Sequence, residues 1–263
     1  TESEAGGPFG QDILFYSRRI GGNPHGYPDL EDHEYLDIPS NTSILGAAKF
    51  SGKTEKGLSI GILETVTQKE FAEIDDNGER REELVEPLSN YFVGRLQKDY
   101  REGNTQIGGI FTAVNRDLEN TNLNFLHESA YSGGIDFSHR WKDIWYVAGN
   151  TVMSRVNGST EAITNTQERI EHNFQRVDAS HLEVDTSRTS LTGVGGNIKI
   201  GKVGNGKKFN FEGGVSWRTP ELEINDLGFL RSTDDITHYY WANYRIDQPF
   251  SIFRSMRFNY NHW

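Results

Sequence analysis

The chain has 263 residues, a formal net charge of -11 and a sequence pI of about 5.2, and this acidic balance argues against nucleic acid as a partner. Hydrophobic residues make up only 35% of the chain, whereas 28 glycines and an aromatic share of 12% favour strands and turns over packed helices. It contains no cysteine, which excludes disulfides, thiolate nucleophiles and cysteine-based metal centres.

Residues 1–42 hold most of the prolines and show no regular hydrophobic period, so we expect an irregular segment that leads into the fold. The compact basic feature of this segment is Arg18 and Arg19, in the stretch FYSRRIGG. These two side chains are candidates for binding a ligand carboxylate in a bidentate manner. The alternative is that they pair with the acidic residues of 29–37.

Long segments in which apolar and polar residues alternate recur throughout residues 43–263. In 91–116, for example, Phe92 and Leu96 share one parity in the first strand, and Ile107 and Phe111 share one parity in the second. The opposite parity of these strands carries the polar residues Arg95, Gln97, Asp99, Gln106 and Thr112. This period predicts about ten long strands in an antiparallel up-and-down meander. The expected strands are 43–52, 58–67, 91–100, 105–116, 129–141, 145–156, 190–202, 208–218, 236–245 and 252–263.

The expected connections alternate between short and long. Short turns are predicted near 53–57, 101–104, 142–144, 203–207 and 246–251, where Asn205-Gly206 is a strong hairpin signal. The long polar links are 68–89, 116–128, 157–189 and 219–235. Short turns at one end and long loops at the other are typical of outer-membrane β-barrels, so we predict an all-β fold of that type, closed or incomplete. A soluble barrel or sandwich with long strands is the alternative.

One long link is expected to be partly helical. Ile163, Ile170 and Phe174 lie near helical spacing in 160–174, and Thr160 is the candidate N-cap.

Three short motifs resemble known sites but lack their context. Residues 57–61 match GxSxG, yet more strand follows instead of the helix that a nucleophile elbow needs. Residues 201–208 nearly match a phosphate loop, but Lys208 stands where Ser or Thr should bind magnesium. Residues 75–79 resemble part of a calcium loop without its full ligand spacing, so we predict no cofactor and leave a loop-bound calcium ion open.

The long links carry the remaining candidate ligand-binding residues. Arg176, Asp178 and His181 lie together in 157–189, and Asn225 and Asp226 lie in 219–235. Glu221, Glu223 and Asp226 are also candidates for the carboxylate pair of a glycoside hydrolase. We predict no catalytic or metal-binding residue, because acids abound in this chain and no tight metal-ligand spacing occurs among its histidines.

Several stretches in order along the chain resemble the domain of unknown function 5916 family of Bacteroidota outer-membrane proteins. They are LFYSRRIGG (14–22), ILGAAKFSGKTEKGLSIGILETVT (44–67), VEPLSNYFVGRLQKDYREGNTQIGGIFTAVNR (85–116), FQRVDASHLEVD (174–185), RTSLTGVGG (188–196) and EINDLGFL (223–230). The resemblance implies an outer-membrane β-barrel related to glycan use, since members usually carry an upstream carbohydrate-binding family 9-like domain. Members are longer, so the chain resembles an internal portion.

The expected function is passage or surface binding of a small solute or glycan at the bacterial outer membrane, without covalent catalysis. Membrane lipid would then be one partner and other outer-membrane proteins another. The apolar parity would face lipid, and aromatic residues near strand ends would form interfacial girdles: Tyr91, Tyr100, Trp141, Trp145, Trp217, Tyr239, Trp241 and Trp263. The alternatives are a cell-surface polysaccharide hydrolase that uses loop carboxylates, and a structural subunit recognised at an open sheet edge.

Overall fold

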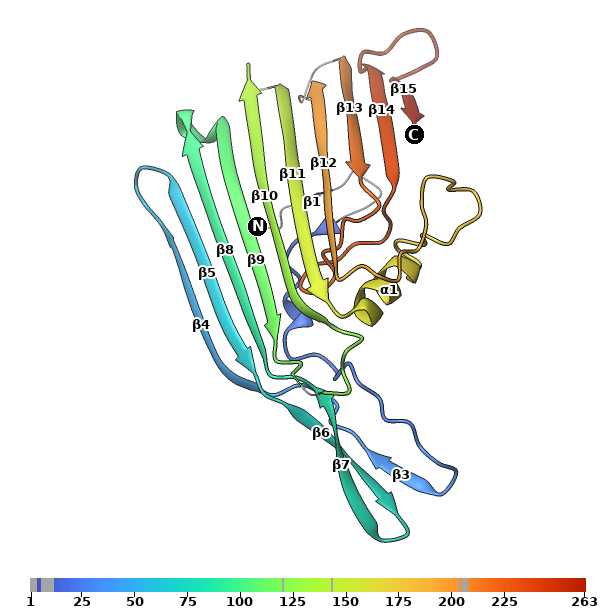
Figure 1. The fold of residues 1–263 in the computed structure, drawn as a ribbon. Coiled ribbons are helices and arrows are strands. Elements are labelled where there is room, and N and C mark those ends of the chain that lie inside the picture. The colour runs from blue at the N-terminus through green and yellow to red at the C-terminus, as the bar shows by residue number, and fades with distance from the viewer. Residues whose placement is uncertain (1–3, 6–11, 120, 143, 203, 205–207) are drawn as a thin grey trace.

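The fold is all-β, with a ten-stranded antiparallel meander as its main sheet (Figure 1). The computed structural model describes residues 4–5, 12–119, 121–142, 144–202, 204 and 208–263. The sheet runs in the order β15-β14-β13-β12-β11-β10-β9-β8-β5-β4. Its strands are β4 (Ile44–Lys53), β5 (Leu58–Thr67), β8 (Ser89–Tyr100), β9 (Thr105–Arg116), β10 (His127–Trp141), β11 (Trp145–Gly158), β12 (Ser190–Lys202), β13 (Phe209–Arg218), β14 (Asp235–Ile246) and β15 (Met256–His262).

All ten expected strands are therefore present and paired as hairpin neighbours. The largest difference lies in β15, which begins at Met256, whereas the alternation predicted a start at 252. The Asn205-Gly206 hairpin signal lies outside the described residues, but the strands on either side of it pair antiparallel, with Lys202 opposite Phe211. Alternation predicts these strands well because one face of the sheet is apolar.

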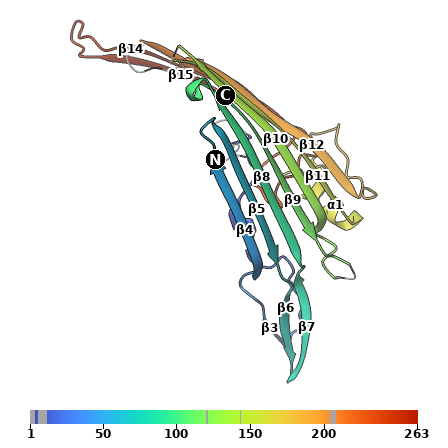
Figure 2. The same ribbon diagram turned by 90° about the vertical axis from the view of Figure 1, so that its left-hand side faces the viewer.

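The link 68–89 is not a loop. It contains β6 (Glu70–Asp76) and β7 (Glu79–Glu86), which form a three-stranded sheet with β3 (Glu34–Asp37). This small sheet projects beyond the lower end of the large one (Figure 2). The sequence does not predict this sheet, because most side chains of β7 are charged and β6 has only two fully buried apolar residues, Ala72 and Ile74.

The segment 1–42 is also less irregular than expected. Besides β3 it contains the short strands β1 (Glu4–Ala5) and β2 (Asp12–Ile13) and the 3-10 turn η1 (Ser17–Arg19). A second short 3-10 turn, η2 (Arg101–Gly103), joins β8 to β9.

The expected helix forms but is shorter, since α1 spans Thr160–Glu168 and the chain turns to an extended conformation at Arg169. Its N-cap is Ser159 rather than Thr160: the Ser159 hydroxyl oxygen accepts a hydrogen bond from the Ala162 amide at 3.0 Å. Among the described residues, no helix has the length and hydropathy to span a bilayer.

The two faces of the large sheet differ. Segments 12–20 and 219–234 lie against one of them, called here the packed face, and bring Leu14, Leu222, Ile224 and Leu227 into the core. The Ile13 amide donates to the Phe229 carbonyl at 3.0 Å, so the two segments also bind each other. The hydrophobic core thus lies between these segments and the lower half of the packed face.

The opposite face, called here the open face, bears the apolar side chains of the alternating strands. The register places Phe92, Leu96, Ile107 and Phe111 on it, together with Ile135 of the next strand. Ile135 is 65% exposed and Leu96 is 55% exposed. Exposed large hydrophobic residues on this same face occur on all ten strands: Phe50, Ile62, Leu96, Ile107, Phe111, Ile135, Phe137, Met153, Val194, Ile198, Ile200, Phe209, Val215, Tyr240, Tyr244, Phe258 and Tyr260.

The aromatic residues expected in interfacial girdles are distributed over both faces of the sheet. Four of them, Tyr100, Trp141, Trp145 and Trp217, lie on the open face. Three others, Tyr91, Tyr239 and Trp241, point to the packed face, where Tyr91 is buried in the core. Position near a strand end therefore does not predict that an aromatic residue lies on the open face, because successive residues of a strand point to opposite faces.

Candidate functional site

A row of charged and polar side chains crosses the upper part of the packed face. Lys53 Nζ lies 2.6 Å from Asp99 Oδ2, and Gln97 Nε2 donates to Asp99 Oδ1 at 3.2 Å. Arg95 forms a bidentate ion pair with Asp136, in which Nη2 donates to Oδ1 at 2.9 Å. These residues come from β4, β8 and β10, so the row bridges strands that are not all neighbours.

The ion pair between Arg95 and Asp136 depends on a glycine in the strand between them. Strand β9 lies between Arg95 and Asp136, and Gly108 stands where the two side chains meet. A Cβ on Gly108 would lie 2.7 Å from Arg95 Nη2 and 2.9 Å from the Asp136 oxygens. The bare backbone therefore leaves room for the ion pair to cross the strand.

A second polar group on the same face is centred on Glu212. The Tyr146 hydroxyl donates to one Glu212 oxygen, and the Tyr239 hydroxyl donates to the other at 2.9 Å. Each ring lies against a glycine of a neighbouring strand, since a Cβ on Gly201 or Gly214 would lie 2.6 Å from a tyrosine atom. The upper packed face is thus lined by hydrogen-bonded polar groups.

An open groove of about 890 Å³ lies on the packed face over β4, β5, β8 and β9. Segment 15–18 closes one side of it and contributes Arg18, and the strands contribute Lys49, Lys53 and Arg95. Ser51 and Ser59 add hydroxyl groups. Among the residues that line the groove, all of which the structure describes, none is acidic.

A buried polar cluster joins segment 219–234 to the lower end of the sheet. Arg116 Nη1 donates to Asp226 Oδ1 at 2.6 Å and to the His127 carbonyl at 2.9 Å. His127 Nδ1 lies 2.8 Å from Asp226 Oδ2. Burial alone would raise the pKa of the Asp226 carboxyl, but the charges of His127 and Arg116 outweigh it and lower the pKa.

The cluster continues in an order that resembles a catalytic triad. His127 Nε2 lies 2.8 Å from the Thr166 hydroxyl oxygen, so Asp226, His127 and Thr166 follow one another as acid, base and hydroxyl. Thr166 is fully buried, however, and its hydroxyl donates to the Ala162 carbonyl of the same helix at 2.9 Å. A nucleophile must reach its substrate, so these contacts fasten α1 to the sheet instead.

A second buried pair lies nearby. His172 Nε2 is 3.0 Å from Glu223 Oε2, and both side chains are almost fully buried. The Asn225 amide donates to Glu223 Oε1, and the Asn225 side chain accepts from the Leu230 amide at 2.8 Å. Both Glu223 and Asp226 are therefore engaged with basic residues inside the protein.

The structure distributes the predicted ligand-binding residues over three places. Arg18 lies in the groove on the packed face. Arg19, Asn225 and Asp226 line a separate hollow of about 300 Å³, where Arg19 Nε donates to the Gly228 carbonyl at 3.2 Å. The acids of 29–37 are not their partners: in the described residues neither Arg18 nor Arg19 forms an ion pair with them.

Arg176, Asp178 and His181 do come together, but around Asp234, an acid that was not among the predicted residues. Arg176 forms an ion pair with Asp234, and His181 Nε2 lies 2.9 Å from the same carboxylate. Asp178 lies 3.5 Å from Arg176 Nε. Asp234 belongs to the next long link, so nothing local in the sequence pointed to it.

The acidic stretch 75–79 forms the tight turn of the β6–β7 hairpin. The Gly78 amide donates to Asp75 Oδ1 at 3.1 Å, and Arg80 Nε lies 3.3 Å from Asp75 Oδ2. Asp76 lies 3.2 Å from His33 Nε2. These carboxylates thus bind groups of the hairpin and His33 beside it, and no group of three or more metal-ligating side chains occurs in the described part of the chain.

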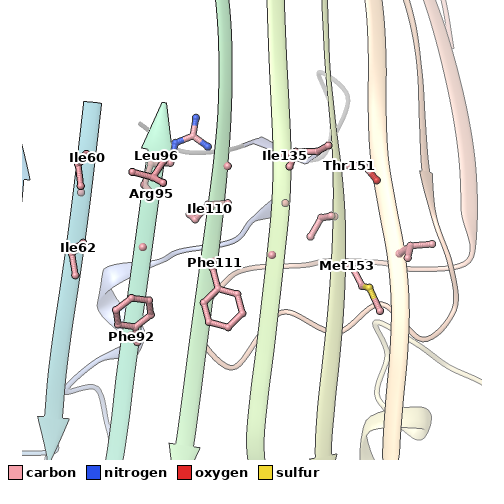
Figure 3. A pocket seen from close by; sticks show the side chains of 17 residues that line it. Ile60, Ile62, Phe92, Arg95, Leu96, Ile110, Phe111, Ile135, Thr151 and Met153 are labelled. Atoms are coloured by element: carbon pink, nitrogen blue, oxygen red, sulfur yellow. The ribbon is translucent and has the colours of Figure 1, made fainter. Parts of the chain in front are cut away.

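The open face carries an apolar hollow of about 660 Å³ (Figure 3). Gly94, Gly109 and Gly133 form part of its floor, on three consecutive strands. Phe92, Leu96, Phe111, Ile135 and Met153 surround it.

Two comparisons with known proteins gave no match, neither among curated proteins nor among solved structures. The profile of one family, described as a domain of unknown function (DUF5916), matches residues 8–263. Since this match covers almost the whole of the described fold, the chain belongs to the DUF5916 family.

Proposed function

We propose that the large sheet is part of an outer-membrane β-barrel, which serves passage or surface binding of a small solute or glycan without covalent catalysis. The open face contacts lipid, and the packed face lines the lumen. The observation that carries the proposal is the exposure of large apolar side chains on the open face of every strand. In water such a continuous apolar surface is costly, whereas in a bilayer it is the expected outer surface of a barrel.

Strand length supports the same proposal. A tilted strand needs about 9–11 residues to cross the hydrocarbon region. Strand β10 has 15 residues, β11 has 14 and β12 has 13. These strands therefore cross a bilayer with residues to spare, whereas strands of globular proteins typically have about 5–6.

The packed face supplies the polar side that a lumen needs. Its upper half bears the row from Lys53 to Asp136 and the group around Glu212. Segments 12–20 and 219–234 fill its lower half. We propose that these two segments act as an internal plug that narrows the passage.

A structural subunit remains the second candidate, because the sheet has two free edges. Strands β4 and β15 end the strand order, and in the described residues they pair only with β5 and β14. Every residue of β4 is exposed. Such an edge binds further strands readily, so closure would require strands from elsewhere. The hydrolase alternative gains no support, since Glu223 and Asp226 are enclosed in ion pairs.

Neighbouring residues of β10 allow a direct test. Phe137 is 41% exposed on the open face, and Ser138 has the opposite parity. Because the chain has no cysteine, Phe137→Cys and Ser138→Cys each provide a single labelling site for a nitroxide probe. In the full-length protein in lipid vesicles, we expect the label at 137 to be reached by oxygen, which concentrates in lipid, and the label at 138 by a water-soluble nickel chelate. Equal access of the chelate to both labels would refute the proposal.

A further inference from the structure

We propose that the groove on the packed face binds a small solute that carries an oxyanion, namely a carboxylate, sulfate or phosphate group. This proposal rests on the proposed function in one respect only: if the sheet is part of a barrel, the groove identifies the class of solute that the lumen binds. The binding itself is a property of the groove, whose residues come from segment 15–18 and from β4, β5, β8 and β9.

The charge of the groove is opposite to that of the whole chain. The chain has 38 acidic and 27 basic residues and a net charge of -11. The groove has four basic side chains, Arg18, Lys49, Lys53 and Arg95, and no acidic one among its lining residues, all of which lie in the described part of the chain. An anion that the protein surface repels in general is therefore attracted at this place.

Two of these cations are held by carboxylates and two are available. Lys53 pairs with Asp99, and Arg95 pairs with Asp136. Arg18 and Lys49 are exposed and form no ion pair with any described residue. A bound oxyanion would give Arg18 and Lys49 the charge-assisted hydrogen bonds that Lys53 and Arg95 already make.

The rest of the groove suits a polar organic solute rather than an ion alone. Tyr16, 37% exposed, and Phe15 offer aromatic surface, and Ser51 and Ser59 offer hydroxyl groups. Its volume of about 890 Å³ lies within the range of pockets that hold small organic ligands, about 300–1,000 Å³. An acidic saccharide combines the ring, hydroxyls and negative charge that these groups recognise.

Equilibrium binding to the full-length protein in detergent tests this inference. The probes are galacturonate, neutral galactose and inorganic sulfate, and the double variant is R18Q/K49Q. The matched control is R80Q/R81Q, which removes the same charge from the β6–β7 hairpin, where Arg80 pairs with Glu73 and Arg81 pairs with Glu34. All four side chains are exposed, and circular dichroism checks that each variant folds.

We expect galacturonate to bind at low salt and galactose to bind at least tenfold more weakly. R18Q/K49Q should weaken galacturonate binding by about ten- to a hundredfold, and R80Q/R81Q should leave it unchanged. If sulfate binds as tightly as galacturonate, the oxyanion is the recognised group. If galacturonate binds more tightly, the sugar ring contributes to binding as well. Higher salt should weaken binding in either case.

Three results would overturn the inference: equal binding of galactose and galacturonate, equal losses in the two double variants, or no binding of any anionic probe. None of these readouts requires a membrane. If the labels at 137 and 138 show no lipid contact while galacturonate binding behaves as expected, the proposed function fails and the anion groove stands.

Discussion

At the scale of single residues, glycine decides how closely segment 219–234 approaches the sheet. A Cβ on Gly193 would lie 2.1 Å from the Leu222 amide nitrogen and 2.4 Å from the Glu221 carbonyl carbon. These are backbone atoms, which cannot turn aside as a side chain can. Gly61, on the same face, is a useful contrast, because the nearest atom to its Cβ would be Arg95 Cβ at 4.0 Å.

We therefore expect Gly193→Ala to destabilise the folded protein by about 3 kcal/mol or more, since the segment must move away from the sheet. Gly61→Ala should change the free energy of unfolding by less than about 0.5 kcal/mol. Urea titration of both variants measures these free energies. Equal stability of the two variants would show that the segment does not depend on this close contact.

The buried pair of His172 and Glu223 makes stability depend on pH. Burial on its own would lower the pKa of His172, but the hydrogen bond and charge of Glu223 outweigh it and raise the pKa above its ordinary value. The folded protein thus holds this proton more tightly than the unfolded chain. The stabilisation is complete below the ordinary histidine pKa of about 6.5 and is lost as the pH rises through the raised value.

Accordingly, we expect the free energy of unfolding to fall as the pH rises above about 6.5. Glu223→Gln should flatten this slope, because the neutral amide no longer favours the histidine cation, and it should also lower stability at every pH. Unfolding curves at several pH values measure both effects. An unchanged slope in the variant would assign the pH dependence to other groups.

At the scale of elements, helix α1 depends on a cap that joins two connections. The Ser159 hydroxyl accepts from the Ala162 amide and donates to the Asn124 carbonyl at 2.6 Å. Thr160 already lies inside the helix, so its hydroxyl does not form the N-cap. We expect Ser159→Ala to cost about 1 kcal/mol of stability and Thr160→Ala to cost less. Thermal unfolding compares the two, and a larger loss for Thr160→Ala would contradict this assignment.

At the scale of the whole molecule, the proposed lipid contact makes the two faces respond oppositely to charge. Ile198 is 49% exposed on the open face, and Thr237 is exposed on the other. We expect Ile198→Arg to destabilise the protein in lipid vesicles by about 2–4 kcal/mol, because an arginine must leave water, and Thr237→Arg to have little effect. Urea titration in vesicles measures this difference, and equal stability of the two variants would count against lipid contact.

Much of the strand order was predictable from the sequence. Alternation located the ten strands of the large sheet and their pairing as hairpins, since apolar residues such as Phe92 and Leu96 of β8 lie an even number of positions apart on one face. The β6–β7 hairpin was missed because most residues of β7 are charged and show no apolar alternation. Local pattern therefore predicts a strand best when one whole face is apolar.

The candidate site was predictable only in part. Arg18, which lines the groove, was among the predicted candidates, but Lys49, Lys53 and Arg95 were not, because each lies alone in an ordinary strand. Their approach depends on strand register and on where segment 15–18 crosses the sheet. The same holds for Asp234, whose contact with Arg176 spans 58 residues.

The sequence by itself determined the properties that depend on near neighbours: the strands, their tight turns and the division into an apolar and a polar parity. Only the tertiary structure decided which distant charges meet. Arg116 and Asp226 are separated by 110 residues, and they pair because segment 219–234 folds onto the packed face. Alternation is a property of consecutive residues, whereas such contacts depend on the register and packing of segments that lie far apart in the chain.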